Sequence, residues 1–114
     1  MGAVDLLVLV APLLFGQAPV LRVGQPLVTV HQRLLAQGWQ VSLEAQEARP
    51  DDQQTLAIKK RLPSLISCSG TGAGYCAYGY SRQGEQLRLV SQGDGPLLRW
   101  QIGDSWFGSG VAAR

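Results

Sequence analysis

The chain has few of the residues from which catalytic and metal sites are usually built. Its 114 residues include one histidine, His31, and two cysteines, Cys68 and Cys76. One histidine cannot serve several candidate serines and acids, and no Gly-X-Ser-X-Gly motif is present. Two cysteines with one distant histidine do not complete a zinc site. We therefore expect no catalytic activity, no bound metal and no cofactor.

Charge of either sign is also scarce. Ten Lys and Arg oppose eight Asp and Glu, a net charge of +2, which is far below what a surface that follows a nucleic-acid backbone usually carries. We therefore expect no nucleic-acid partner. The basic residues Lys59, Lys60 and Arg61 are consecutive; such a short run is usually a solvated helix end, but it is also a candidate contact for an acidic surface or anionic lipid.

A long apolar run occurs only near the start of the chain. Residues 6–15 are too few for the roughly 20 of a transmembrane helix. Small residues follow at 16–18, so residues 1–18 resemble a secretory signal peptide, although Asp5 stands where a positive n-region is expected and Pro19 follows the expected cut. A buried core strand or helix is the alternative. Membrane association would require that this segment be retained.

The remainder is typical of one small domain. Fourteen glycines indicate a turn-rich chain made partly of strands. We place a single α+β domain at residues 19–102, with a tail at residues 103–114. Within it, residues 19–23 are a short strand candidate.

Helical spacing follows. The apolar residues Leu27, Val30, Leu34 and Leu35 predict a helix over residues 26–37 that ends at Gly38. On this helix His31 borders the apolar stripe, where a partly buried histidine without a chemical role is the usual outcome.

The next segments are less regular. Alternation over residues 39–43 predicts a strand, and the polar residues 44–54 predict a loop. Asp51 or Asp52 could cap a second helix that runs to Leu62, with the basic run in its last turn. The competing interpretation is a strand over residues 55–58.

The C-terminal half predicts four strands joined by short turns. Apolar residues recur at a spacing of two around positions 66–68, 76–80, 87–89 and 98–102. Consecutive hairpins give an antiparallel meander whose polar face presents Arg88, Arg99 and Gln101 to water. The other face needs a cover, which the helix at 26–37 supplies. The expected fold is therefore α+β, with one or two helices packed on one face of a four- or five-stranded antiparallel sheet.

The two cysteines bracket a glycine-rich turn between neighbouring strands. This arrangement predicts a disulfide between Cys68 and Cys76, which for so short a loop contributes roughly 2 to 3 kcal/mol in the chain-entropy model. Free buried thiols are the first alternative. A disulfide implies an oxidising compartment, so we expect a periplasmic or extracellular protein.

Aromatic residues are the remaining candidates for binding. Tyr75, Tyr78, Tyr80 and Trp100 are expected in the core, because aromatic side chains usually supply buried area. Trp106 and Phe107 stand out because they lie in the expected tail. They either pack back on the sheet or contact a partner.

The chain resembles uncharacterised small exported bacterial proteins. The resemblance rests on residues 21–26 leading into a helix, on the helix end Gln37-Gly38-Trp39, and on Cys-Ser-Gly-Thr-Gly before a Cys-X-Tyr-X-Tyr hairpin. The layout is also similar to the β-lactamase inhibitor protein repeat and to small outer-membrane assembly lipoproteins, which bind proteins through their sheet and loops. No contact residue of those families matches a position here.

These observations favour an exported protein-binding module whose partner is an unknown protein. The candidate contacts are Trp106, Phe107, Lys59, Lys60 and Arg61. The alternative is an accessory subunit of a membrane-associated assembly, held by an uncleaved N-terminal apolar segment.

Overall fold

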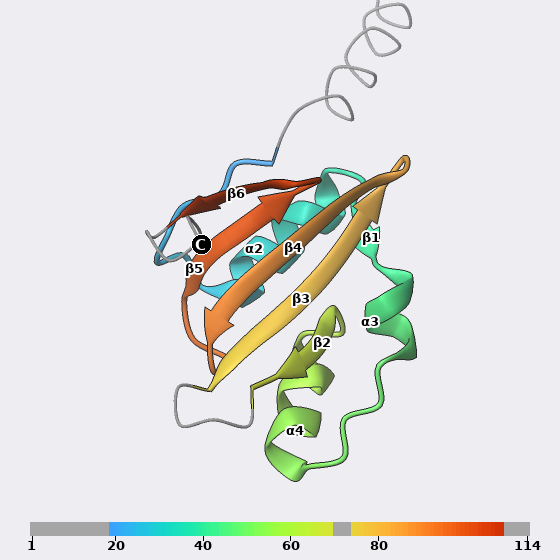
Figure 1. Ribbon diagram of the computed structural model, residues 1–114, viewed down its shortest axis with the longest axis vertical. Coiled ribbons are helices and arrows are strands. Elements are labelled where there is room, and N and C mark those ends of the chain that lie inside the picture. Colours follow the sequence, from blue (N-terminus) through green and yellow to red (C-terminus); the bar gives the residue numbers. More distant parts are fainter. Residues whose placement is uncertain (1–18, 70–73, 109–114) are drawn as a thin grey trace, which may run out of the picture.

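The structure is a computed structural model that describes residues 19–69 and 74–108. It is the α+β fold that the sequence predicts, with helices packed on an antiparallel sheet, but the sheet has six strands where four or five were expected (Figure 1). In chain order the elements are α2 (Leu27–Ala36), β1 (Gln40–Val41), α3 (Leu43–Glu47), α4 (Gln53–Arg61), β2 (Leu65–Cys68), β3 (Tyr75–Arg82), β4 (Glu85–Gln92), β5 (Leu97–Ile102) and β6 (Ser105–Gly108).

Consecutive strands from β2 to β6 pair with one another antiparallel, which gives four neighbouring pairs. The order of the sheet is β1-β3-β4-β5-β6, and β2 also pairs with β3, on the edge that β1 occupies. The two short strands divide this edge: β1 lies opposite Tyr80 and Ser81, and β2 lies opposite residues 76–78. The predicted meander of four strands is therefore confirmed as β2 to β5, and β1 and β6 bring the sheet to six strands.

One face of the sheet is covered by α2, which lies behind the strands in Figure 1. The helix buries Leu27, Val30 and Leu34, the residues whose spacing predicted it. The sheet contributes Tyr78 and Tyr80 from β3, with leucines from β4 opposite them. This is the hydrophobic core, and α3 and α4 lie beside it near β1 and β2.

Helix α3 corrects the sequence interpretation of residues 39–54. The predicted strand at 39–43 is confined to Gln40–Val41, and a short helix replaces the first part of the predicted loop. The cause is local: the Ser42 hydroxyl accepts a hydrogen bond from the Ala45 backbone N–H at 3.2 Å and caps the helix. The second predicted helix is confirmed as α4, and the Asp52 carboxylate caps it by accepting from the Thr55 N–H at 2.9 Å.

The domain also extends further than predicted at its C-terminal end. Residues 105–108 of the expected tail form β6, which pairs with β5 and places Phe107 opposite Trp100. At the other end, residues 19–23 form no strand. Instead, Gly24 N–H donates to Leu97 O at 2.7 Å, which holds this segment beside β5.

The predicted signal peptide at residues 1–18 and most of the glycine-rich turn lie outside the described residues. Among the residues that the structure does describe, no helix is long and apolar enough to cross a membrane.

Candidate functional site

In the part of the chain that the structure describes, helices leave most of the sheet face opposite α2 uncovered, and only the start of α3 reaches it, at Gly79 and Arg88; we call it the open face (Figure 1). Side chains alternate along each strand, so the register assigns to this face every second residue of β3 to β6. Its central members are Tyr75, Ala77, Gly79, Arg88, Val90, Arg99, Gln101 and Trp106. Most are polar or aromatic, in contrast to the leucine-rich core face.

Arg88 lies at the centre of the open face and is paired with a carboxylate from α3. Its Nη2 atom is 2.8 Å from Oε1 of Glu44, a residue 44 positions earlier in the chain. The two side chains are 40% and 59% exposed, so the pair is accessible to solvent. An ion pair this exposed contributes little stability.

Arg99 lies on the neighbouring strand and stacks on Trp106. Its guanidinium carbon is 4.3 Å from the centre of the Trp106 ring, which is a cation–π contact between β5 and β6. Gly108 makes this close pairing possible, because a Cβ atom there would lie 2.6 Å from the Cα of Arg99. Trp106 was a predicted binding residue, and its place on the open face comes from the strand that the sequence interpretation missed.

Two hollows mark the open face, and both are lined by Arg88. One, of about 230 Å³, lies toward Gly79 and Gln101. The other, of about 390 Å³, lies toward Tyr75, Arg99 and Trp106. Tyr75 is 46% exposed, so the sequence expectation that it belongs to the core is wrong, whereas Tyr78 and Tyr80 are fully buried as expected. The cause is parity, since Tyr75 alternates with Cys76 and points to the opposite face.

Gly79 positions the element that supplies Glu44. The Ser42 N–H donates to Gly79 O at 3.0 Å, and the Gly79 N–H donates to Ser64 O at 2.9 Å. A Cβ atom on Gly79 would lie 2.4 Å from Ser42 Oγ and 2.9 Å from Ile66 Cδ1. Only glycine therefore lets the α3 cap approach the sheet this closely.

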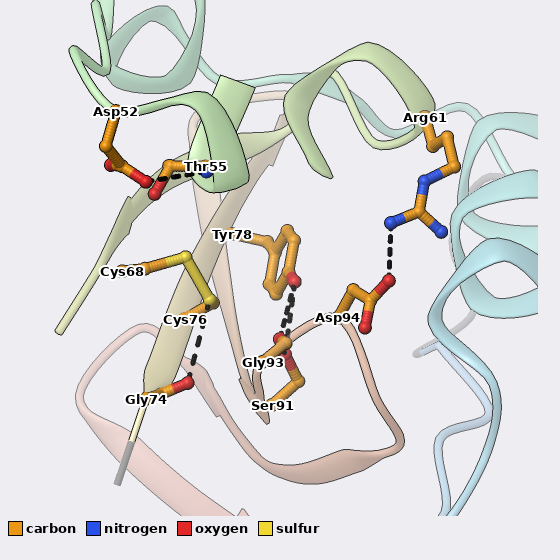
Figure 2. Close-up of a disulfide and its surroundings, with 10 residues drawn as sticks. All are labelled: Asp52, Thr55, Arg61, Cys68, Gly74, Cys76, Tyr78, Ser91, Gly93 and Asp94. Atoms are coloured by element: carbon orange, nitrogen blue, oxygen red, sulfur yellow. Dashed lines mark hydrogen bonds and ion pairs between the residues drawn. A yellow bond between two sulfur atoms is a disulfide. The ribbon is translucent and has the colours of Figure 1, made fainter. Parts of the chain in front are cut away.

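The predicted disulfide between Cys68 and Cys76 is confirmed, and it joins β2 to β3 at directly opposed positions (Figure 2). Cys76 is buried in the core cluster. The bond ties the end of a four-residue strand to the central part of the sheet. The disulfide therefore has a structural role, since it holds β2 against β3; we call it the staple.

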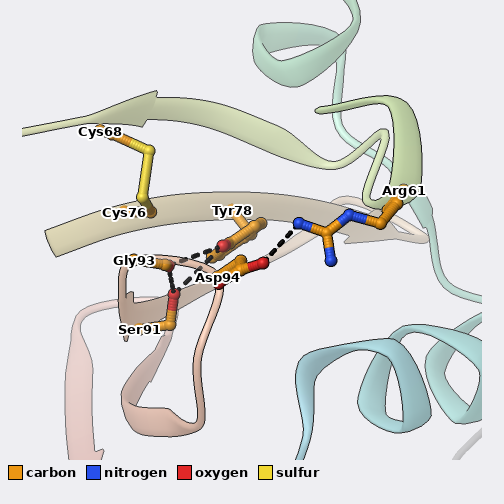
Figure 3. A network of polar contacts seen from close by, with 7 residues as sticks. All are labelled: Arg61, Cys68, Cys76, Tyr78, Ser91, Gly93 and Asp94. Atoms are coloured by element: carbon orange, nitrogen blue, oxygen red, sulfur yellow. Dashed lines mark hydrogen bonds and ion pairs between the residues drawn. A yellow bond between two sulfur atoms is a disulfide. The ribbon is translucent and has the colours of Figure 1, made fainter. Parts of the chain in front are cut away.

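A polar network lies below the staple, at the β4–β5 turn (Figure 3). The Tyr78 hydroxyl is 3.1 Å from Ser91 Oγ, and both hydroxyls reach Gly93 O, at 3.3 and 2.6 Å. Burial raises the pKa of Tyr78, so its hydroxyl stays protonated. Beside it Arg61 pairs with Asp94, and this bond holds the pKa of the carboxyl below its usual range. The hydroxyl network ties the turn to β3, and the exposed ion pair connects it to α4.

His31 is partly buried and lies at the end of a row of hydrogen-bonded groups that continues into the core through Tyr80 and Ser64. Its Nδ1 atom is 2.7 Å from the Tyr80 hydroxyl, which accepts a hydrogen bond from Ser64 Oγ at 2.8 Å. Ser64 is completely buried, so this serine cannot reach a substrate. Burial lowers the pKa of His31 and raises that of Tyr80. The geometry favours a packing role for all three groups.

The basic run of α4 lies away from the open face. Lys59 Nζ donates to three backbone carbonyls, those of Ala45, Leu65 and Pro63, at 2.7, 2.7 and 3.2 Å. Arg61 is paired with Asp94, while Lys60 is exposed. Helix α4 packs near β2, at the edge opposite β6, so the structure does not bring the run together with Trp106.

Phe107 lies on the other side of β6 from Trp106. It stacks on Trp100 with ring centres 6.2 Å apart and remains 45% exposed. The two neighbouring aromatic residues therefore serve opposite faces.

Sequence reasoning placed Arg88 and Arg99 on the water-facing side but did not single them out, and it missed Glu44. The alternation in the C-terminal half was the available signal for the arginines. Nothing local indicates the partner of Arg88, because the ion pair depends on how α3 packs.

Comparisons with protein-family models, with curated proteins and with solved structures found no match to this chain. Within residues 19–69 and 74–108, no group of three or more His, Cys, Asp or Glu side chains is placed to hold a metal ion.

Proposed function

We propose that this protein is an exported protein-binding module, without catalytic activity, that binds its partner through the open face of its sheet. One observation carries the proposal: the open face groups Arg88, Arg99, Trp106 and Tyr75 on neighbouring strands. Arginine, tryptophan and tyrosine are the residue types most enriched at the energetic centres of protein interfaces.

The shape of the face also favours a protein partner. The two hollows lie on one surface and share Arg88 in their lining. A small-molecule site is usually lined mainly by apolar side chains, whereas Arg88 lines both hollows together with Glu44 in one and Arg99 in the other. A protein segment laid across the strands would instead use both hollows at once.

The export part of the proposal is supported by the Cys68–Cys76 disulfide, because such bonds persist in oxidising compartments. We place the protein in the periplasm or outside the cell. This location is tested by measuring the intact mass of the protein isolated from its own cells, before and after reduction and alkylation. A mass for a chain beginning at Pro19, with both cysteines blocked until reduction, supports export; full length with two free thiols contradicts it.

The binding surface is tested by photo-cross-linking in the native cells. A benzoylphenylalanine at Ala77, inside the larger hollow, is compared with one at Gln32 on the exposed side of α2. We expect one discrete adduct, identified by mass spectrometry, from position 77 and none from position 32. The binding role of the open face is refuted if position 77 gives no adduct or if both positions give the same products.

A further inference from the structure

The open face presents two guanidinium groups on adjacent strands. Arg88 lies opposite Gln101, and Arg99 lies opposite Val90, so the two arginines are diagonal neighbours on one face of β4 and β5. Diagonal neighbours across an antiparallel pair are about 7 to 8 Å apart between backbones. The face therefore offers two anion-binding groups at a defined spacing.

Within the fold, Arg88 already binds a carboxylate. The Glu44 carboxylate pairs with it at 2.8 Å, and both side chains are accessible. An exposed pair of this kind is held weakly, so a carboxylate from another molecule can replace Glu44 at little cost. Glu44 thus occupies the place that a carboxylate of another molecule would take on Arg88, and the two carboxylates compete for the arginine.

Arg99 is prepared for the same chemistry. Its stack on Trp106 uses the flat surface of the guanidinium group and leaves the N–H edges for a planar acceptor such as a carboxylate. Among the residues that the structure describes, no acidic side chain forms an ion pair with Arg99.

We infer that the open face binds an extended, acidic segment of a partner protein, with carboxylates on alternate residues. In an extended strand, residues i and i+2 point to the same side and lie about 6.5 to 7 Å apart, which matches the diagonal spacing of the arginines. One carboxylate displaces Glu44 from Arg88 and the other binds Arg99. This inference rests on the proposed function and specifies the chemistry of the partner.

Phosphate groups of a single-stranded nucleic acid are the competing ligand class, because arginine and aromatic side chains bind them too. The observations favour carboxylates for two reasons. Arg88 already holds a carboxylate, and the net charge of +2 is small for a nucleic-acid surface.

The test uses short synthetic peptides and the isotopically labelled protein, followed by NMR titration. The probe Ac-Thr-Glu-Thr-Glu-Thr-amide places its carboxylates on one side of a strand. Its isomer Ac-Thr-Glu-Glu-Thr-Thr-amide places them on opposite sides, and the Gln version of the probe has none. We expect the alternating peptide to shift amide signals of β4, β5 and β6 and to bind about threefold more tightly than its isomer, the gain from one additional exposed ion pair.

Four variants separate the inference from general electrostatic attraction. Arg88→Gln and Arg99→Gln should each weaken the alternating peptide about threefold, while Glu44→Gln should strengthen it by a similar factor because the competitor is gone. Arg33→Gln, on exposed surface of α2, removes the same charge and should change binding little. A merely structural role of Glu44 predicts no strengthening. All four residues are solvent-accessible, and the amide spectrum of each variant reports whether it is folded.

The inference is overturned if the two isomers bind equally, if Glu44→Gln leaves binding unchanged or weaker, or if oligothymidylate binds these residues more tightly than the peptide. The cross-linking experiment tests the binding function independently of the partner's chemistry. An adduct at position 77 with a partner segment that lacks alternate acids refutes the chemistry proposed here and leaves the binding function intact. The lack of an adduct refutes the function itself.

Discussion

Lys59 joins three parts of the fold, and its replacement gives the sharpest test of the packing. Its ammonium group donates to Ala45 O in the middle of α3, to Pro63 O after α4 and to Leu65 O in β2. Lys59→Met keeps a side chain of similar length and removes the charge. The three carbonyls then lose a shared donor, and the segments they belong to lose their link.

The magnitude follows from the bonds and from their exposure. A hydrogen bond to a charged group contributes about 1.5 to 3 kcal/mol, but the three bonds share one ammonium and are not additive. Burial, and to a smaller extent Arg49, lowers the pKa of Lys59, which shows that holding the charge here costs desolvation. The net expected loss for Lys59→Met is about 2 kcal/mol, or roughly 8 to 16 °C in Tm for a domain of this size.

The assay is urea unfolding at neutral pH followed by circular dichroism, with Tm measured in parallel. Lys60→Met is the matched control, because it removes the same charge from the next, exposed position of α4 and should stay within about 0.5 kcal/mol of the wild type. Equal stabilities for the two variants would show that the three-carbonyl contact does not support the fold.

Three further changes probe the features that position the site. Gly79→Ala should cost about 1 to 3 kcal/mol in urea unfolding, and adding Ser42→Gly should recover part of that loss; no coupling between the two sites would contradict the close approach. The Cys68→Ser/Cys76→Ser variant should lose about 2.5 kcal/mol of unfolding free energy, whereas no loss would show that β2 docks without the staple. Because burial lowers the pKa of His31 in the folded state, the wild type should lose stability relative to His31→Gln as pH falls below about 6.5, which unfolding at pH 7.5 and 5 measures; a constant difference would refute this.

The parts of the fold that the sequence predicts are those with a strong local pattern. The spacing of Leu27, Val30 and Leu34 predicts α2 because a helix that covers a sheet must present one apolar side. Alternation in β3, β4 and β5 predicts the meander, and the short distance between the cysteines along the chain predicts their pairing. In these segments local preference and tertiary packing favour the same structure.

The missed elements are short ones whose stability comes from neighbours. Helix α3 has five residues and depends on the Ser42 cap and on the space above Gly79. Strand β6 has four residues, two of them glycine or serine, and is held by its register with β5. The candidate site has the same origin: Arg88 meets Glu44 only through the packing of α3, so no local pattern could reveal the pair.

The edge of β3 that β1 and β2 share determines how prone the protein is to aggregate before its disulfide forms. Eight-residue β3 would otherwise present a long strand with free backbone groups, the kind of surface that pairs with another chain and aggregates. Strand β2 shields the stretch at residues 76–78, and the disulfide holds it there. Without the disulfide this template for self-association stays open for longer, so folding under reducing conditions favours aggregates, whereas oxidation closes the edge.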